Sequence, residues 1–77
     1  MSARPVKHSV TLNGHRTSIS LEDAFWKELR QIADRRDLPI NALVAEIDTG
    51  RGLETGLASA IRVYVLEALR KDVPRGP

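Results

Sequence analysis

Three hydrogen-bonding side chains, those of Arg16, Ser18 and Ser20, alternate with other residues in one short segment of the chain. Arginine presents a planar guanidinium with five N–H donors, and a serine hydroxyl both donates and accepts hydrogen bonds. Alternate residues of a β-strand lie on opposite faces, so these three side chains share one face while Ile19 and Leu21 share the other. The pattern predicts a strand with a buried inner face and an outer face suited to hydrogen bonding with a polar partner.

Other combinations of residues that carry chemistry do not stand out. The sequence has no cysteine, which excludes disulfides and thiolate metal sites. His8 and His15 have no cluster of carboxylates beside them, so we interpret them as packed or edge-exposed residues, with metal sensing as a remote alternative. The glycine-containing segment 49–56 lacks the Lys-Ser/Thr of a phosphate-binding loop, and no nucleophile–base pair is evident. We therefore expect that the protein is not an enzyme and that it binds neither a metal ion nor a cofactor.

The net charge of +2 is unevenly distributed along the chain. Residues 1–21 contain Arg4, Lys7 and Arg16 and no acidic residue, whereas residues 22–50 contain more acidic than basic residues. A basic N-terminal third is expected of a protein with an anionic partner. It is equally expected of a charged segment that keeps a protein in solution.

A chain of 77 residues supports one domain, which we place at residues 7–72, between flexible tails at residues 1–6 and 73–77. A core of this size rarely supplies more than about 3–5 kcal/mol of stability, and no disulfide supplements it. We therefore expect a homo-oligomer. No apolar run is long enough to cross a membrane and no signal-peptide core is present, so a cytoplasmic location without membrane association is expected.

Two alternating segments, residues 6–12 and 16–21, flank Asn13-Gly14, which is the dipeptide most typical of a two-residue hairpin turn. With that turn, Leu12 faces His15, Thr11 faces Arg16, Val10 faces Thr17 and Ser9 faces Ser18. The inner face then holds Val10, Leu12, Thr17, Ile19 and Leu21, and the outer face holds Lys7, Ser9, Thr11, Arg16, Ser18 and Ser20.

Up to three amphipathic helices are predicted after the hairpin, which makes the fold class α+β and mostly α. They span residues 22–36, 39–48 and 57–71, with a loop over residues 49–56. Ser20 is the expected N-cap of the first helix, with Asp23 completing a variant capping box. Pro39 is well suited to be the first residue of the second helix. The third helix is apolar around much of its surface, which argues for cover by a second chain.

Several motifs carry a resemblance to a known family. They are Arg-Thr-Ser-Ile-Ser-Leu at 16–21, Phe-Trp-Lys-Glu-Leu-Arg-Gln-Ile-Ala at 25–33 and Leu-Pro-Ile-Asn-Ala-Leu-Val-Ala-Glu-Ile at 38–47. With these motifs the chain resembles the ribbon-helix-helix family, the Arc and MetJ type of DNA-binding dimer. Together with His-Ser-Val-Thr-Leu at 8–12 and Ser-Ala-Ile-Arg-Val-Tyr-Val-Leu-Glu at 59–67, it is similar to short bacterial proteins of this family with an extra N-terminal strand.

The resemblance implies an intertwined homodimer that regulates transcription. One strand from each chain would form a ribbon that enters the major groove of double-stranded DNA. Base contacts would fall on Arg16, Ser18 and Ser20, phosphate contacts on Lys7 and on the backbone of Ile40 and Asn41, and the dimer core on Ile19, Leu21, Phe25, Trp26, Leu29, Leu43, Val44 and Ile47. At its position, Arg16 would pair with O6 and N7 of guanine.

Two features depart from the family pattern. Pro39 stands where the family often has a capping serine or threonine, and it removes one amide donor from the expected phosphate site. The strand before Asn13 widens the ribbon, because four coplanar strands span about 14 Å and the major groove is about 12 Å wide. The alternative function is therefore a protein-interaction module on a ribbon-helix-helix dimer whose widened sheet does not enter DNA.

Overall fold

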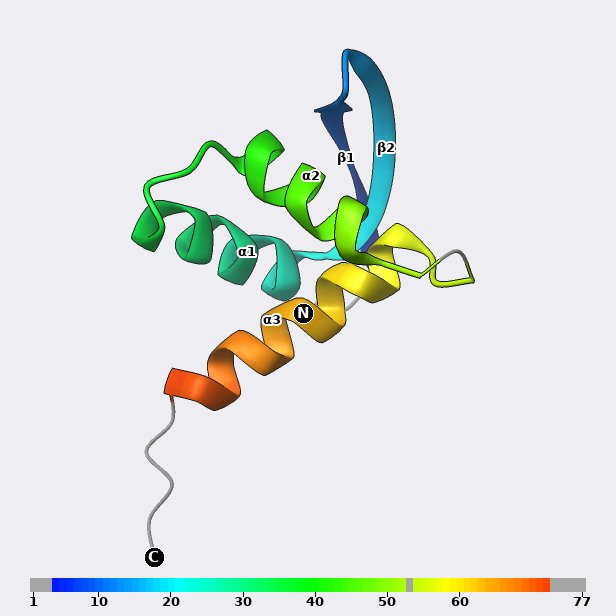
Figure 1. Cartoon of the computed structure of the whole chain (residues 1–77). Helices are drawn as coiled ribbons and strands as arrows, with labels where there is room; N and C mark the ends of the chain where they lie inside the picture. Colours follow the sequence, from blue (N-terminus) through cyan, green and yellow to red (C-terminus); the bar gives the residue numbers. More distant parts are fainter. Residues whose placement is uncertain (1–3, 53, 73–77) are drawn as a thin grey trace, which may run out of the picture.

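The computed structural model describes residues 4–52 and 54–72, which form a hairpin and three helices (Figure 1). The elements are β1 (Pro5–Leu12), β2 (His15–Glu22), α1 (Asp23–Arg35), α2 (Ile40–Gly50) and α3 (Leu57–Asp72). The hairpin stands along one side of the helices, and its turn end extends past them (Figure 1). The predicted α+β class, with a hairpin followed by three helices, is confirmed.

The predicted hairpin register is also confirmed. β1 and β2 pair antiparallel from Leu12–His15 at the turn to Pro5–Glu22 at the open end. Both turn residues have positive φ, 51° at Asn13 and 81° at Gly14, as a two-residue type I′ turn requires. Pro5 lacks an N–H group and is therefore tolerated at the first position of the strand.

The core lies between the inner face of the hairpin and the three helices. Its buried residues are Val10, Ile19, Leu21, Leu29, Ile32, Ala33, Leu43, Val44, Ile47, Ile61 and Val65. Each helix contributes residues at helical spacing, such as Leu29 and Ile32 on α1 or Ile61 and Val65 on α3, because one stripe of each helix faces inward. Within one chain, every element therefore adds to the same core.

The predicted N-cap at Ser20 is wrong. The strand continues through Leu21 because Pro5 and Val6 pair with Glu22 and Leu21, which keeps this part of the chain extended. The N-cap is Glu22, and its side chain makes no capping hydrogen bond. Helix α1 consequently begins at Asp23, one residue later than predicted, and ends one residue earlier than predicted.

The start and end of α2 also differ from the prediction by small amounts. Pro39 is the N-cap with φ −61° and ψ 149°, so the helix begins at Ile40 rather than at Pro39 itself. The predicted loop over 49–56 begins later, because α2 continues through Gly50. The hydroxyl of Thr49 donates to the carbonyl of Ala45 at 3.0 Å, which is a bond within the last helical turn.

Candidate nucleic-acid interface

The outer face of the hairpin is a continuous polar surface built by both strands. Its residues are Lys7, Ser9 and Thr11 on β1 and Arg16, Ser18 and Ser20 on β2, and all six are exposed. The register makes Ser9 the cross-strand neighbour of Ser18, and Thr11 that of Arg16. The three residues expected to contact bases thus lie on one exposed face, and the strand-pairing partner of each carries another polar side chain.

The charge of this face is positive. In the part of the chain that the structure describes, neither Lys7 nor Arg16 is held in an ion pair, so both cations are available to a partner. Glu22 follows the same alternation at the end of β2, but the guanidinium of Arg62 donates to its Oε1 at 2.8 Å. A hydrogen bond from its own backbone and the contact with Arg62 lower the pKa of the Glu22 carboxyl, so its negative charge is paired within the chain.

The N-terminus of α2 lies beside the hairpin. The N–H of Thr11 donates to Oδ1 of Asn41 at 3.2 Å, which joins the outer edge of β1 to the second residue of α2. The amides of Ala42 and Leu43 both donate to the carbonyl of Pro39. The amides of Ile40 and Asn41 precede them and have no acceptor within the described residues. Free amides at the positive end of a helix dipole attract anions. Because the Thr11–Asn41 bond brings this end of α2 to β1, the expected phosphate site lies next to the outer face of the hairpin.

The residues expected in a dimer core are covered within a single chain to a large extent. Of these, Ile19, Leu21, Leu29, Leu43, Val44 and Ile47 are buried, and Phe25 and Trp26 are half-buried against the same core. Trp26 stacks on His8 of β1 with ring centroids 4.0 Å apart and an interplanar angle of 9°. Arg62 lies over the ring of Phe25 at 5.9 Å from its centroid. Burial of the six core residues needs no second chain.

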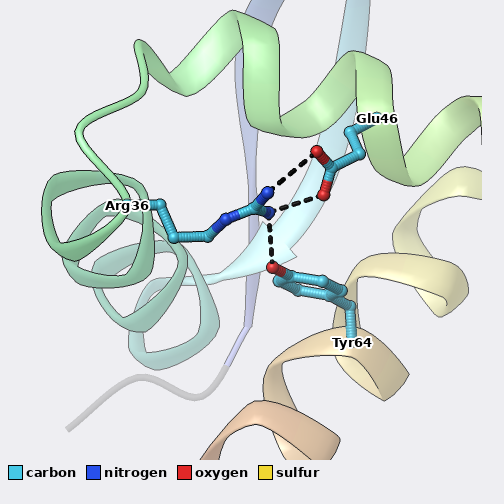
Figure 2. A network of polar contacts seen from close by, with 3 residues as sticks. All are labelled: Arg36, Glu46 and Tyr64. Atoms are coloured by element: carbon cyan, nitrogen blue, oxygen red, sulfur yellow. Dashed lines mark hydrogen bonds and ion pairs between the residues drawn. The ribbon is translucent and has the colours of Figure 1, made fainter.

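A polar network that the sequence did not predict connects the three helices. Figure 2 shows Arg36, just after α1, reaching Glu46 on α2 and Tyr64 on α3. Its guanidinium donates to Oε1 of Glu46 at 3.0 Å and to the hydroxyl of Tyr64 at 3.1 Å (Figure 2). The contact with Arg36 lowers the pKa of Glu46, and the contacts with Glu46 and Tyr64 raise that of Arg36. The network links the end of α1 to α2 and α3 through largely exposed side chains.

Sequence reasoning missed two contacts of this site. One is the bond from Thr11 to Asn41, for which no local pattern exists because 30 residues separate the partners. The other is the stack of His8 on Trp26, for which a signal was present: the hairpin register puts His8 on the inner face, opposite Ile19. Among the described residues, no group of three or more His, Cys, Asp or Glu side chains could hold a metal ion. No described helix combines the length and apolar character needed to cross a membrane.

Comparison with known proteins places the chain in a family. A search of curated proteins and a search of solved structures each returned no match. A family model described as a ribbon-helix-helix domain matches residues 5–69, from the first residue of β1 nearly to the end of α3. Members of this family are typically DNA-binding transcription regulators, generally as homodimers, and not enzymes. The match covers well over half of the chain, and the chain belongs to the ribbon-helix-helix domain family.

Proposed function

We propose that this protein is a sequence-specific DNA-binding transcription regulator that acts as a homodimer in the cytoplasm. The observation that carries the proposal is the exposed outer face of the hairpin, where Arg16, Ser18 and Ser20 project together. A β-ribbon with hydrogen-bonding side chains on its outer face can present them to base edges in the major groove.

Arg16 is the residue with most capacity to select a base. Its guanidinium can donate to both O6 and N7 of guanine, which discriminates against other bases by about 1–3 kcal/mol. Ser18 and Ser20 can bond to several bases, so they add affinity and contribute less selectivity. Lys7 and the amides of Ile40 and Asn41 take phosphates, which position the ribbon without reading sequence.

A stripe of apolar residues on α3 supports the homodimer. Val63 and Leu66 are each 54% exposed and Leu69 is 38% exposed, at a spacing that lines them up along one side of the helix. We call these three residues the α3 stripe. A two-fold contact places the same surface of each chain against the other, so an apolar stripe can cover its own copy. Because the family generally forms homodimers, a second copy is the occupant we propose.

The function is tested with Arg16→Ala. A preferred duplex is first selected from a random pool with the wild-type protein, and binding to it and to random DNA is then measured by fluorescence anisotropy. We expect Arg16→Ala to weaken binding to the selected duplex by about 1–3 kcal/mol and to change binding to random DNA much less. Equal losses on both duplexes would restrict Arg16 to a phosphate contact.

Arg30→Ala is the matched control, because Arg30 is exposed on α1 and its loss changes the net charge by the same amount. Binding should also weaken as salt is added, since phosphate contacts release counterions from DNA. A wild-type protein that selects no duplex from the pool, or binds DNA independently of salt, would contradict the proposed function.

One observation favours the second candidate, a protein-interaction module. β1 pairs with β2 along its entire length, so joining two chains through the free edges of β2 would give a sheet of four strands. Such a sheet spans about 14 Å, more than the groove width of about 12 Å. Failure of duplex selection together with an intact dimer would favour this candidate.

A further inference from the structure

We infer that β1 lies over the walls of the major groove, where its side chains Lys7, Ser9 and Thr11 bind the phosphate backbone while Arg16 on β2 reads bases. This inference rests on the proposed function and deepens it, because it gives a role in DNA binding to the strand that precedes the ribbon strand. It also explains how a sheet wider than the groove can bind DNA.

The place of β1 follows from the order of strands in a ribbon made by two chains. β1 occupies one edge of β2, so the partner's β2 pairs at the other edge and the two β1 strands become outermost. With about 4.8 Å between neighbouring strands, each β1 lies about 7 Å from the centre of the sheet. Half the width of the major groove is about 6 Å. β1 therefore lies over the phosphates that line the groove, and β2 lies over the base edges.

β1 is fastened to the helices, so it stays at the edge of the sheet when DNA binds. Val10 is 3% exposed in the core, and His8 stacks on Trp26 of α1. The N–H of Thr11 donates to Oδ1 of Asn41 at the start of α2. Moving β1 out of the way would break these contacts together with its pairing to β2. DNA binding must therefore accommodate β1 rather than displace it.

The outer face of β1 has the chemistry of a phosphate-contacting surface. Lys7 is a cation, Ser9 and Thr11 carry hydroxyl donors, and β1 contains no acidic residue. All three side chains are exposed. Lysine, serine and threonine are among the residues that most often bond to phosphate oxygens. None of the three has the paired donors of a guanidinium, so β1 is better suited to backbone contact than to selecting a guanine.

The expected phosphate site at the start of α2 lies on the same side of the sheet. α2 packs against β1, and the bond from Thr11 to Asn41 joins the edge of β1 to the second residue of that helix. A phosphate held by the amides of Ile40 and Asn41 would stand beside the outermost strand. Both features therefore meet the same stretch of DNA backbone.

The arrangement predicts a specific salt dependence. In a homodimer each β1 faces one wall of the groove, so each contacting residue of β1 reaches two phosphates. The logarithm of the binding constant falls with the logarithm of the salt concentration, with a slope of about −0.9 for each phosphate neutralised. Loss of Lys7 from both chains should therefore reduce the steepness of this slope by about two. Because every duplex has the same phosphates, the reduction should not depend on DNA sequence.

The first experiment is Lys7→Ala, with binding to the selected duplex and to random DNA measured by fluorescence anisotropy over a range of salt concentrations. We expect both affinities to fall by the same factor and both slopes to become less steep by about two. Lys27→Ala is the matched control, since it removes the same charge from an exposed position on α1 and should keep the wild-type slope. A loss confined to the selected duplex, or an unchanged slope, would overturn the inference.

The second experiment adds a cation to the same face. Ser9→Lys places it beside Ser18, and we expect tighter binding to both duplexes with slopes steeper by about two. A gain in affinity cannot result from misfolding. Gln31→Lys adds the same charge at an exposed position on α1 and should leave the slopes unchanged. Equal slopes in Ser9→Lys and wild type would contradict a phosphate beside β1.

The third experiment locates the contact on DNA. Neutral methylphosphonates replace the phosphates of the selected duplex one at a time, and each duplex is bound to wild type and to Lys7→Ala. We expect two positions, on opposite walls and symmetric about the centre of the site, that weaken wild-type binding and do not weaken Lys7→Ala further. If no replacement has this property, Lys7 contacts no phosphate and the inference fails.

These outcomes separate the inference from the proposed function. Loss of specificity with Arg16→Ala, combined with wild-type salt slopes in Lys7→Ala and Ser9→Lys, would overturn the role of β1 and leave the proposed function standing. Failure of the wild-type protein to select any duplex would remove both. Circular dichroism checks that each variant is folded.

Discussion

Asp37 is the residue whose backbone directs the chain from α1 toward α2. Its φ is 58°, in the left-handed region that glycine usually occupies at this position after a helix. Its N–H donates to the carbonyl of Asp34 at 3.0 Å, and that of Leu38 donates to the carbonyl of Ala33 at 2.9 Å. This pair of bonds is the Schellman motif, which satisfies two carbonyls at the end of α1. The conformation costs a residue with a Cβ about 1–2 kcal/mol.

We expect Asp37→Gly to stabilise the protein by about 0.5–1 kcal/mol, because it removes this cost while the added freedom of glycine in the unfolded chain offsets part of the gain. Urea denaturation followed by circular dichroism measures the change. Asp37→Ala removes the same carboxylate but keeps the Cβ, so it should give no comparable gain. An equal gain in stability in both variants would show that the charge of Asp37, rather than its backbone conformation, limits the stability of the protein at this turn.

At the scale of elements, the three helices meet at Arg36, which bonds to α2 through Glu46 and to α3 through Tyr64 (Figure 2). Arg36 lowers the pKa of Glu46 in the folded protein. The bond therefore stabilises the fold at pH values above the ordinary carboxyl pKa, and this contribution is lost as the pH falls through the lowered pKa. The pKa of Glu22 is also lowered, by a hydrogen bond from its own backbone and by Arg62, so its charged form likewise stabilises the fold and this contribution is lost at low pH. Acidification should therefore loosen the packing of helices and hairpin at two points.

We expect Glu46→Gln to lower the thermal midpoint at neutral pH and to reduce the loss of stability that occurs as pH falls through and below the ordinary carboxyl range, because glutamine does not titrate. Thermal denaturation at a series of pH values measures both effects. Tyr64→Phe is the control, since it removes the hydroxyl bonded to Arg36 and leaves Glu46 in place. It should lower the midpoint and keep the pH dependence. An unchanged pH dependence in Glu46→Gln would argue against a stabilising role for this pair.

At the scale of the whole molecule, the core and the proposed dimer surface are separate. The buried residues of the hairpin and helices pack within one chain, whereas the α3 stripe lies exposed on its surface. Dissociation of the dimer into monomers should therefore leave the fold of each chain largely intact.

We expect Leu66→Glu to weaken dimerisation by at least tenfold, about 1.4 kcal/mol, because it places two like charges in an apolar contact. Analytical ultracentrifugation measures the association, and circular dichroism checks that the monomer keeps its helices. Gln31→Glu introduces the same charge at an exposed position on α1 and should not affect association. If Leu66→Glu associates as strongly as the wild-type protein, the dimer interface lies elsewhere, most simply at the free edge of β2.

The sequence was sufficient to predict the hairpin and its faces, because Asn13-Gly14 fixes the register and alternation then assigns every side chain to a face. The exposed outer face of the candidate site followed from the same two facts. The cap at Ser20 was mispredicted because strand pairing, a tertiary effect, outweighed a local capping pattern. The bond between Arg36 and Glu46 could not be predicted, because it depends on how two helices meet.

The stack of His8 on Trp26 has a practical consequence, because Trp26 is the only tryptophan in the chain. Its indole ring lies on α1 and its stacking partner lies on the first strand, so the emission of this fluorophore depends on whether the two remain in contact. The protein therefore carries an intrinsic optical reporter of strand attachment. Trp26 fluorescence recorded during a titration with DNA or urea can therefore report whether β1 remains packed on α1, without any added label.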